Sequence, residues 1–201
     1  MKKYELTAEF IEKWGKKLFR IKALISFGSV EAGEFGGYVE KEDNLAQEGD
    51  AWVYGDARVY GDARVYGNAR VRDDAWVYGN ARVYGDAWVY GNAWVCGNAR
   101  VCDDAWVYGN AWVCGNADYL LIGRIGSRFS FTTFFKNKDK GITVSCGCFL
   151  GTIAEFRAKV TDTHGNNKHA KMYNLAADMA ELQILGEEHF DKLNTNKSEP
   201  F

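Results

Sequence analysis

The sequence of 201 residues contains no run of about 18 apolar residues, so it predicts no transmembrane helix. Its start, MKKYELTAEFIEKWGKK, lacks the apolar run of a signal peptide, and we expect neither export nor membrane anchoring. The formal net charge is only −2, and no segment is strongly basic. Because binding to a phosphate backbone needs a basic face, this balance argues against general nucleic-acid binding.

Histidine and cysteine are also scarce, with 3 and 5 residues. An odd number of Cys does not suggest a disulfide framework and fits a reducing compartment, so we expect a cytoplasmic protein. Cys96 and Cys114 fall in equivalent positions of the repeat described below. No His lies in that repeat to complete a tetrahedral set, and we predict no metal site and no cofactor.

The chain is organised around residues 51–116, which form eleven hexads without an insertion. Position one is always Ala and position three always Val, whereas position two is Arg or Trp and position four is Tyr, Cys or, once, Arg72. Such alternation is typical of a half-buried strand, and the Gly-Asp or Gly-Asn that follows tolerates a turn. Each hexad therefore predicts a short strand and a corner, with Val and Ala inside.

The pattern Val-x-Gly-Asp/Asn-Ala-x resembles the hexapeptide repeat of left-handed β-helix proteins. The resemblance implies three hexads per turn and the handedness. Pentapeptide and calcium-binding nonapeptide repeats have another period, and residues 51–116 lack the Thr of ice-binding helices. The predicted fold class is mainly β, a left-handed parallel β-helix (hexapeptide solenoid) with an N-terminal cap and a small α+β C-terminal domain.

The predicted domains are an N-terminal strand and cap region (1–50), the β-helix (51–122), the α+β domain (123–193) and a flexible tail (194–201). A cap is expected because an open solenoid end is an unpaired edge. Val39 and Leu45 lie in the phase of the later Ala residues.

In the C-terminal domain we expect strands at Ser127–Lys136 and Ile142–Phe149. A capping box, Thr152 with Glu155, predicts one helix that ends near Gly165. A second helix is predicted from about Lys168 to Leu185, with one apolar face and its charges elsewhere.

Three hexads per turn place residues 18 apart in one column. The first face then carries Trp88 and Trp106, the second Trp94 and Trp112, and the third Arg64, Arg82 and Arg100. Planar side chains at strand spacing can stack on one another, on a ligand or on a partner. We expect self-stacking or a homo-oligomer, a trimer or a dimer, and a ligand groove is the alternative.

A second candidate binding site combines Arg124, Ser127 and Arg128 with His164, Lys168 and His169. The latter segment opens a helix, where free N–H groups, Lys168 and a protonatable His could hold a phosphate or carboxylate. In the alternative interpretation, Asn166 or Asn167 caps the helix and both His lie on the surface.

The lead-in ending Gly-Gly-Tyr-Val, the hexads, and the C-terminal Cys-Gly-Cys-Phe and His-Gly-Asn-Asn-Lys-His segments are similar to hexapeptide-repeat proteins of bacteria and prophages. This resemblance implies a phage setting but no settled activity. We predict a non-enzymatic binding or scaffold protein. In the host cytoplasm, it would inhibit host defence by sequestering a protein partner or a small anionic nucleotide.

The alternative is a hexapeptide-type acyltransferase or another small-molecule enzyme. Acyl transfer in such folds needs a His general base at the subunit seam. Because His164, His169 and His189 all lie outside the repeat, we predict no enzyme and no catalytic residue.

Overall fold

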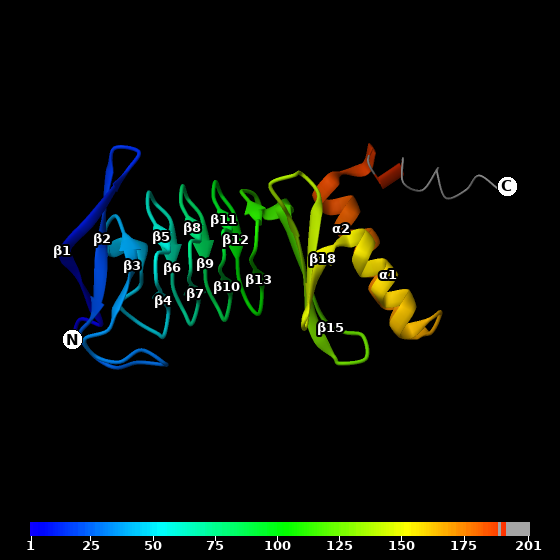
Figure 1. Cartoon of the computed structure of the whole chain (residues 1–201), viewed down its shortest axis with the longest axis horizontal. Coiled ribbons are helices and arrows are strands. Elements are labelled where there is room, and N and C mark those ends of the chain that lie inside the picture. Colours follow the sequence, from blue (N-terminus) through cyan, green and yellow to red (C-terminus); the bar gives the residue numbers. More distant parts are fainter. Residues whose placement is uncertain (189, 192–201) are drawn as a thin grey trace. The chain divides into compact units, whose positions relative to one another are not determined.

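Each hexad forms one two-residue strand followed by a corner, as its alternation predicts. The computed structural model describes residues 1–188, 190 and 191. Its repeat strands are β4 (Trp52–Val53), β5 (Arg58–Val59), β6 (Arg64–Val65), β7 (Arg70–Val71), β8 (Trp76–Val77), β9 (Arg82–Val83), β10 (Trp88–Val89), β11 (Trp94–Val95), β12 (Arg100–Val101), β13 (Trp106–Val107) and β14 (Trp112–Val113). The strands of successive coils lie on top of one another (Figure 1).

Strands three hexads apart pair in parallel, so the repeat is a β-solenoid of nearly four turns with three faces. The first face is β4-β7-β10-β13, the second includes β5-β8-β11-β14, and the third is β6-β9-β12. The predicted columns are confirmed, because Trp88 pairs with Arg70 and Trp106, and Arg82 pairs with Arg64 and Arg100.

The solenoid interior consists of the Val and Ala columns. Every Val of position three and every Ala of position one, from Ala51 to Val113, has no exposed surface. Corner Gly residues adopt positive φ, and Asp73 and Asp103 take their place with φ of 60° and 57°. Asp tolerates this left-handed conformation better than most residues because its short side chain can bond locally.

Cys96 and Cys114 are neighbours in the position-four column of the second face. Their Cα atoms are 4.2 Å apart and the two residues are paired as a disulfide. The odd number of Cys does not suggest this pair, which follows from the 18-residue spacing of the column.

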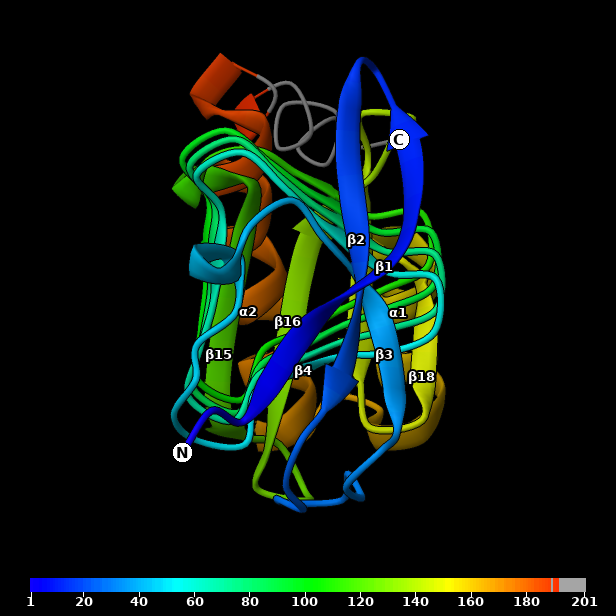
Figure 2. The ribbon, with the colours of Figure 1, turned by 90° about the vertical axis from the view of Figure 1, so that its left-hand side faces the viewer.

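The residues before the repeat form β1 (Tyr4–Lys13), β2 (Lys16–Ala23), β3 (Phe35–Val39) and a short 3-10 turn, η1 (Glu42–Asn44). Strands β1 and β2 pair antiparallel, as do β2 and β3, and β3 pairs in parallel with β5. Figure 2 shows these strands lying across the first coil. Val39 pairs with Val59 and Leu45 with Val65, so both stand in the Val columns; their assignment to the Ala phase was wrong.

The first coil presents a row of carbonyl oxygens, because each coil donates its N–H groups to the next coil. Tyr38 N donates to Ala57 O at 2.9 Å, and Asn44 Nδ2 donates to Ala63 O at 2.8 Å. Lys3 Nζ donates to Gly49 O at 3.2 Å and Ala51 O at 3.0 Å, and burial lowers the pKa of Lys3 to about 8. The N-terminal segment thus satisfies acceptors that an open end would leave unpaired.

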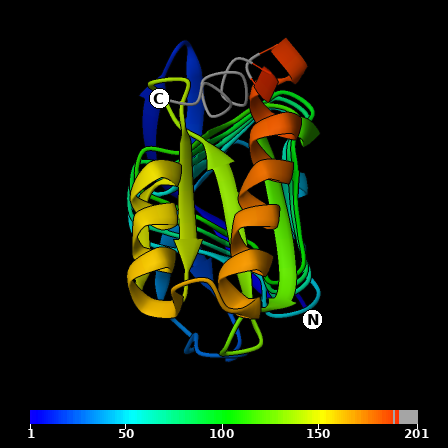
Figure 3. The ribbon, with the colours of Figure 1, turned by 90° about the vertical axis from the view of Figure 1, so that its right-hand side faces the viewer.

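A second unit begins at Ala117. Residues 117–122, which are predicted to belong to the solenoid, therefore belong to this second unit. After a 3-10 turn, η2 (Asn116–Asp118), it comprises β15 (Tyr119–Ile125), β16 (Ser130–Lys136), β17 (Ile142–Cys146), β18 (Phe149–Thr152), α1 (Ile153–His164) and α2 (Lys168–Leu185). The strands form an antiparallel sheet in chain order, and both helices cover one face of it (Figure 3). Phe134, Val144, Phe156 and Tyr173 lie in its core.

The helix ends follow the predicted local chemistry. Thr152 and Glu155 form the predicted capping box of α1, and Asn167 Oδ1 accepts from His169 N and Ala170 N at the start of α2. No helix within the described residues has the length and apolar character to span a membrane. The tail predicted at 194–201 lies outside the described residues.

Candidate functional site

Tyr rings of position four stack from coil to coil, and Arg72 breaks this stack on the first face. The distance between ring centroids is 5.1 Å for the pair Tyr60–Tyr78, 4.9 Å for Tyr66–Tyr84 and 4.6 Å for Tyr90–Tyr108. Arg72 stands in the column between Tyr54 and Tyr90. Its Nε lies 3.3 Å from Asp73 Oδ1, which directs the side chain toward the corner. One coil of this column therefore has no ring.

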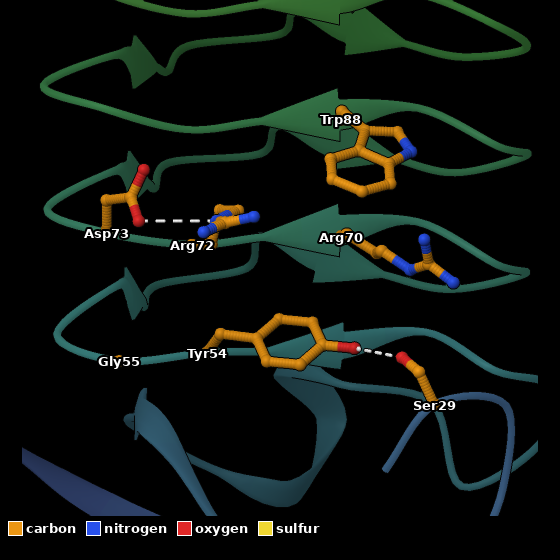
Figure 4. Close-up of a pocket in the computed structure, with 7 residues that line it drawn as sticks. All are labelled: Ser29, Tyr54, Gly55, Arg70, Arg72, Asp73 and Trp88. Carbon is orange, nitrogen blue, oxygen red and sulfur yellow. Dashed lines mark hydrogen bonds and ion pairs between the residues drawn. The ribbon is translucent and has the colours of Figure 1, made fainter.

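A pocket of about 330 Å³ lies at this break. It is lined by Ser29, Tyr54, Gly55, Arg70, Arg72, Asp73 and Trp88 (Figure 4). Tyr54 Oη is 3.2 Å from Ser29 Oγ, so the loop before β3 fixes the ring. Figure 4 shows Arg70 on the coil between Tyr54 and Trp88, and its guanidinium lies 4.8 Å from the Trp88 ring. Three successive coils and one loop together build this pocket.

The pocket carries an excess of positive charge. Arg70 has no ion-pair partner among the residues that the structure describes. Asp73 is the single carboxylate of the lining; it contacts Arg72 and accepts the Gly91 N–H at 3.2 Å. Two guanidinium groups beside one engaged carboxylate favour an anionic ligand.

The next ring of the column, Tyr90, is a neutral group at physiological pH. Burial and the neighbouring Tyr108 raise the pKa of Tyr90 to about 12, although Arg72 opposes the shift. Tyr54 lines the pocket on one side of Arg72, and Tyr90 is the next ring of the column on the other side. Such an arrangement suits a ligand with a flat ring and a negative charge.

The predicted Trp residues stack mainly on their own columns. Trp88 stacks on Trp106 with centroids 5.6 Å apart, and Trp94 packs on Trp76 at 6.2 Å. Trp106 and Trp112 are 42% and 39% exposed. Of the four predicted Trp residues, Trp88 alone lines the pocket at Arg72.

The Arg residues of the third face are exposed and form one column, as predicted. Arg64 and Arg82, but not Arg100, line a second pocket of about 440 Å³. Because Glu42 and Asp43 line it as well, its two positive and two negative charges balance. It is therefore a weaker candidate for an anion than the pocket at Arg72.

The structure brings together half of the second predicted site. Ser127, Arg128 and His164 line a cavity of about 240 Å³ in the second unit, together with Cys146, Phe149, Phe156 and Tyr173. The His164 ring stacks on Tyr173 with centroids 5.8 Å apart, and burial raises the pKa of Tyr173 to about 12. This cavity is largely apolar, and Arg128 and Lys159 are among the residues that line it.

The other three predicted residues do not line that cavity. Arg124 lies over the Phe131 ring at 5.8 Å, Lys168 is exposed, and the His169 ring is 5.9 Å from His164. Asn167 occupies two N–H groups at the start of α2 that an anion would need. The Asn167 cap is confirmed, and both His are half-buried.

Comparison with known proteins supports the solenoid and nothing beyond it. A family model described as the YdcK beta solenoid repeat matches residues 51–65, 63–79, 75–91, 81–97, 93–109 and 99–115. These matches all lie within the hexads, and the chain is similar to that repeat in this part. No curated protein matches the chain.

Proposed function

We propose that this protein is a non-enzymatic binding protein that holds a small anionic nucleotide in the pocket at Arg72. The observation that carries the proposal is the break in the Tyr stack of the first face. Arg72 removes one ring from that column, and the space is bordered by two guanidinium groups and two aromatic side chains.

The spacing of the coils fits a single inserted ring. Stacked strands are about 4.8 Å apart, so position-four groups two coils apart are separated by roughly 9.6 Å. A planar base placed midway would lie about 4.8 Å from each neighbour, close to the spacing at which Tyr90 and Tyr108 stack. The phosphate would then bind Arg70, with Arg72 turning from Asp73 to join it.

The same pocket is poorly suited to acyl transfer or hydrolysis. Its lining contains neither His nor Cys, and its carboxylate is held by Arg72 and the Gly91 N–H. A general base must be within reach of the proton that it removes. The lining therefore favours retention of a ligand over its conversion.

Two finer features of the proposal come from the resemblance of the hexads to hexapeptide-repeat proteins of bacteria and prophages. We infer that the solenoid winds left-handed, a direction that an experimental density map would show. We also infer that the protein acts in a phage-infected cell, where capture of a nucleotide signal would inhibit host defence. In bacteria that defend themselves through such a signal, expression of the wild-type chain should raise phage plating, and expression of Arg72→Tyr should not.

Direct binding is the decisive experiment. Titration of the full chain with mononucleotides and cyclic dinucleotides, followed by calorimetry, should give one class of site for at least one of them. Arg72→Tyr restores the missing ring, and Tyr already occupies this position in other coils, so the variant should fold normally. We expect it to weaken binding at least 100-fold, because it fills the space and removes a cation.

Arg100→Gln is the matched control, since Arg100 is an exposed position-two Arg that lines neither the pocket at Arg72 nor the pocket at Arg64 and Arg82. It should bind like the wild type, whereas Arg70→Gln should bind at least 10-fold more weakly. Absence of heat with every nucleotide at millimolar concentration would refute the function. If Arg72→Tyr and the wild type bound with equal affinity, the nucleotide would bind at a site other than the pocket at Arg72.

A further inference from the structure

Helix α2 has two apolar faces, and one of them is exposed. Its inward face packs Tyr173, Ala177 and Ile184 into the core of the second unit. Its outward face carries Met172, Leu175, Met179 and Leu182, which are 40%, 63%, 57% and 45% exposed. The sequence predicts one apolar face for this helix, and the structure shows a second. We call these four residues the α2 seam.

The spacing of the α2 seam is that of a coiled coil. Its members follow one another at three, four and three residues, the a and d positions of a heptad repeat. Side chains at this spacing form one straight stripe that interlocks with an equivalent stripe on a second helix. Large apolar side chains grouped in this way on a surface mark an interaction site more often than isolated ones do.

The charges at the two ends of α2 have opposite sign. Lys168 and Lys171 are exposed at its N-terminal end, and Glu187 and Glu188 are exposed just beyond its C-terminal end. An antiparallel copy of α2 would place each basic end beside an acidic end. A parallel copy would bring like charges together, which is unfavourable.

The α2 seam is also self-complementary about a two-fold axis that passes between Leu175 and Met179. In an antiparallel pair, Met172 faces Leu182 of the second copy, and Leu175 faces Met179. Each Met of one copy then faces a Leu of the other, and both copies use the same four residues, as a symmetric dimer interface requires. The opposed helix dipoles add to the attraction between the ends.

We propose that a second copy of this chain docks antiparallel on the α2 seam, giving a two-fold symmetric homodimer. This inference is independent of the nucleotide pocket. The 18 residues of α2 form a helix about 27 Å long. Two such helices bury less than the roughly 1,200 Å² of a typical stable interface, so the dimer should dissociate reversibly at micromolar concentration.

Sedimentation of the full chain from about 1 to 200 μM tests the dimer at the concentrations where such an interface should form. The wild type should shift from monomer to dimer, and Leu175→Glu should stay monomeric throughout. Leu150→Glu is the matched control, because Leu150 is 45% exposed on β18 of the same unit. It should dimerise like the wild type. A shared loss of helical circular dichroism in both variants would show misfolding, and Met179→Gln would then replace Leu175→Glu.

Charge exchange tests the direction of the helices. Lys168→Glu with Lys171→Glu should weaken the dimer at least 10-fold, although acidic residues at a helix N-terminus favour the helix itself. Adding Glu187→Lys and Glu188→Lys in the same chain should restore the wild-type affinity. A wild type that stays monomeric at 200 μM overturns the proposal. So does a dimer that survives Leu175→Glu, including one lost in Trp112→Glu, which would place the interface on the solenoid instead.

Discussion

Replacement of Val95 by Asp should unfold the solenoid while the helices of the second unit remain. Val95 has no exposed surface and lies between Val77 and Val113 in its column. A carboxylate there would have apolar neighbours above and below and no hydrogen-bond donor aimed at it. Burying an unpaired charge costs several kcal/mol, which is a large part of the stability of a unit of this size.

Fluorescence and circular dichroism report on the two units separately. All 7 Trp residues lie in the first unit, and α1 and α2 lie in the second. Trp fluorescence of Val95→Asp should therefore resemble that of the denatured chain, and the helical signal at 222 nm should persist. Val95→Thr keeps the shape without the charge and should retain the native fluorescence with a lower urea midpoint.

Arg64→Ala provides the surface comparison, because Arg64 is exposed on the third face. Its free energy of unfolding should change by no more than about 0.5 kcal/mol. If Val95→Asp instead kept the wild-type fluorescence and midpoint, the inward orientation of position three would be wrong.

The solenoid could be predicted from the sequence because every hexad repeats the same alternation of inward and outward side chains. Val and Ala face inward in each copy, and the three hexads per turn that the resemblance implies then define the columns that the structure contains. The segment before the repeat could not be predicted in the same way. Val39 and Leu45 stand twenty residues before their partners, not eighteen, because the segment from Leu45 to Val53 is two residues longer than a hexad.

The pocket at Arg72 was accessible to sequence analysis only in part. Arg72 is the single exception in position four, and Asp73 replaces Gly in the same hexad, so two departures from the repeat coincide. That coincidence could have marked the site. The contribution of Ser29 could not be foreseen, since it comes from a loop that the repeat does not describe.

The second unit shows a different limit. Its hairpin and both helices follow from alternation and caps, whereas β15 and β18 were missed at the edges of the sheet. The α2 seam was missed because Met172, Leu175, Met179 and Leu182 alternate along the helix with residues of the buried face. A helix that is apolar on two sides gives a weak periodic signal, so only its packing separates core from surface.

Replacement of Gly36 by Val should detach β3 from the first coil. A Cβ atom at Gly36 would lie 2.5 Å from Val53 O, 2.6 Å from Ile21 Cγ1 and 2.7 Å from Trp52 Cζ2, none of which can move freely. The neighbouring bonds from Tyr38 N to Ala57 O and from Glu40 N to Val59 O would be lost with the strand. The carbonyl row of the first coil would then be open to other chains.

We expect Gly36→Val to lose several kcal/mol of stability, to expose Trp52, and to form soluble aggregates that grow with concentration. Light scattering would follow the aggregates, and hydrogen exchange would show faster exchange at Tyr38 and Glu40. Phe35→Val, at an exposed site in the same strand, should leave both measurements near the wild type. Unchanged protection of Tyr38 in Gly36→Val would mean that β3 does not need a bare backbone to reach the solenoid. In that case, the side-chain donors Lys3 and Asn44 would account for more of the closure of the first coil than the strand does.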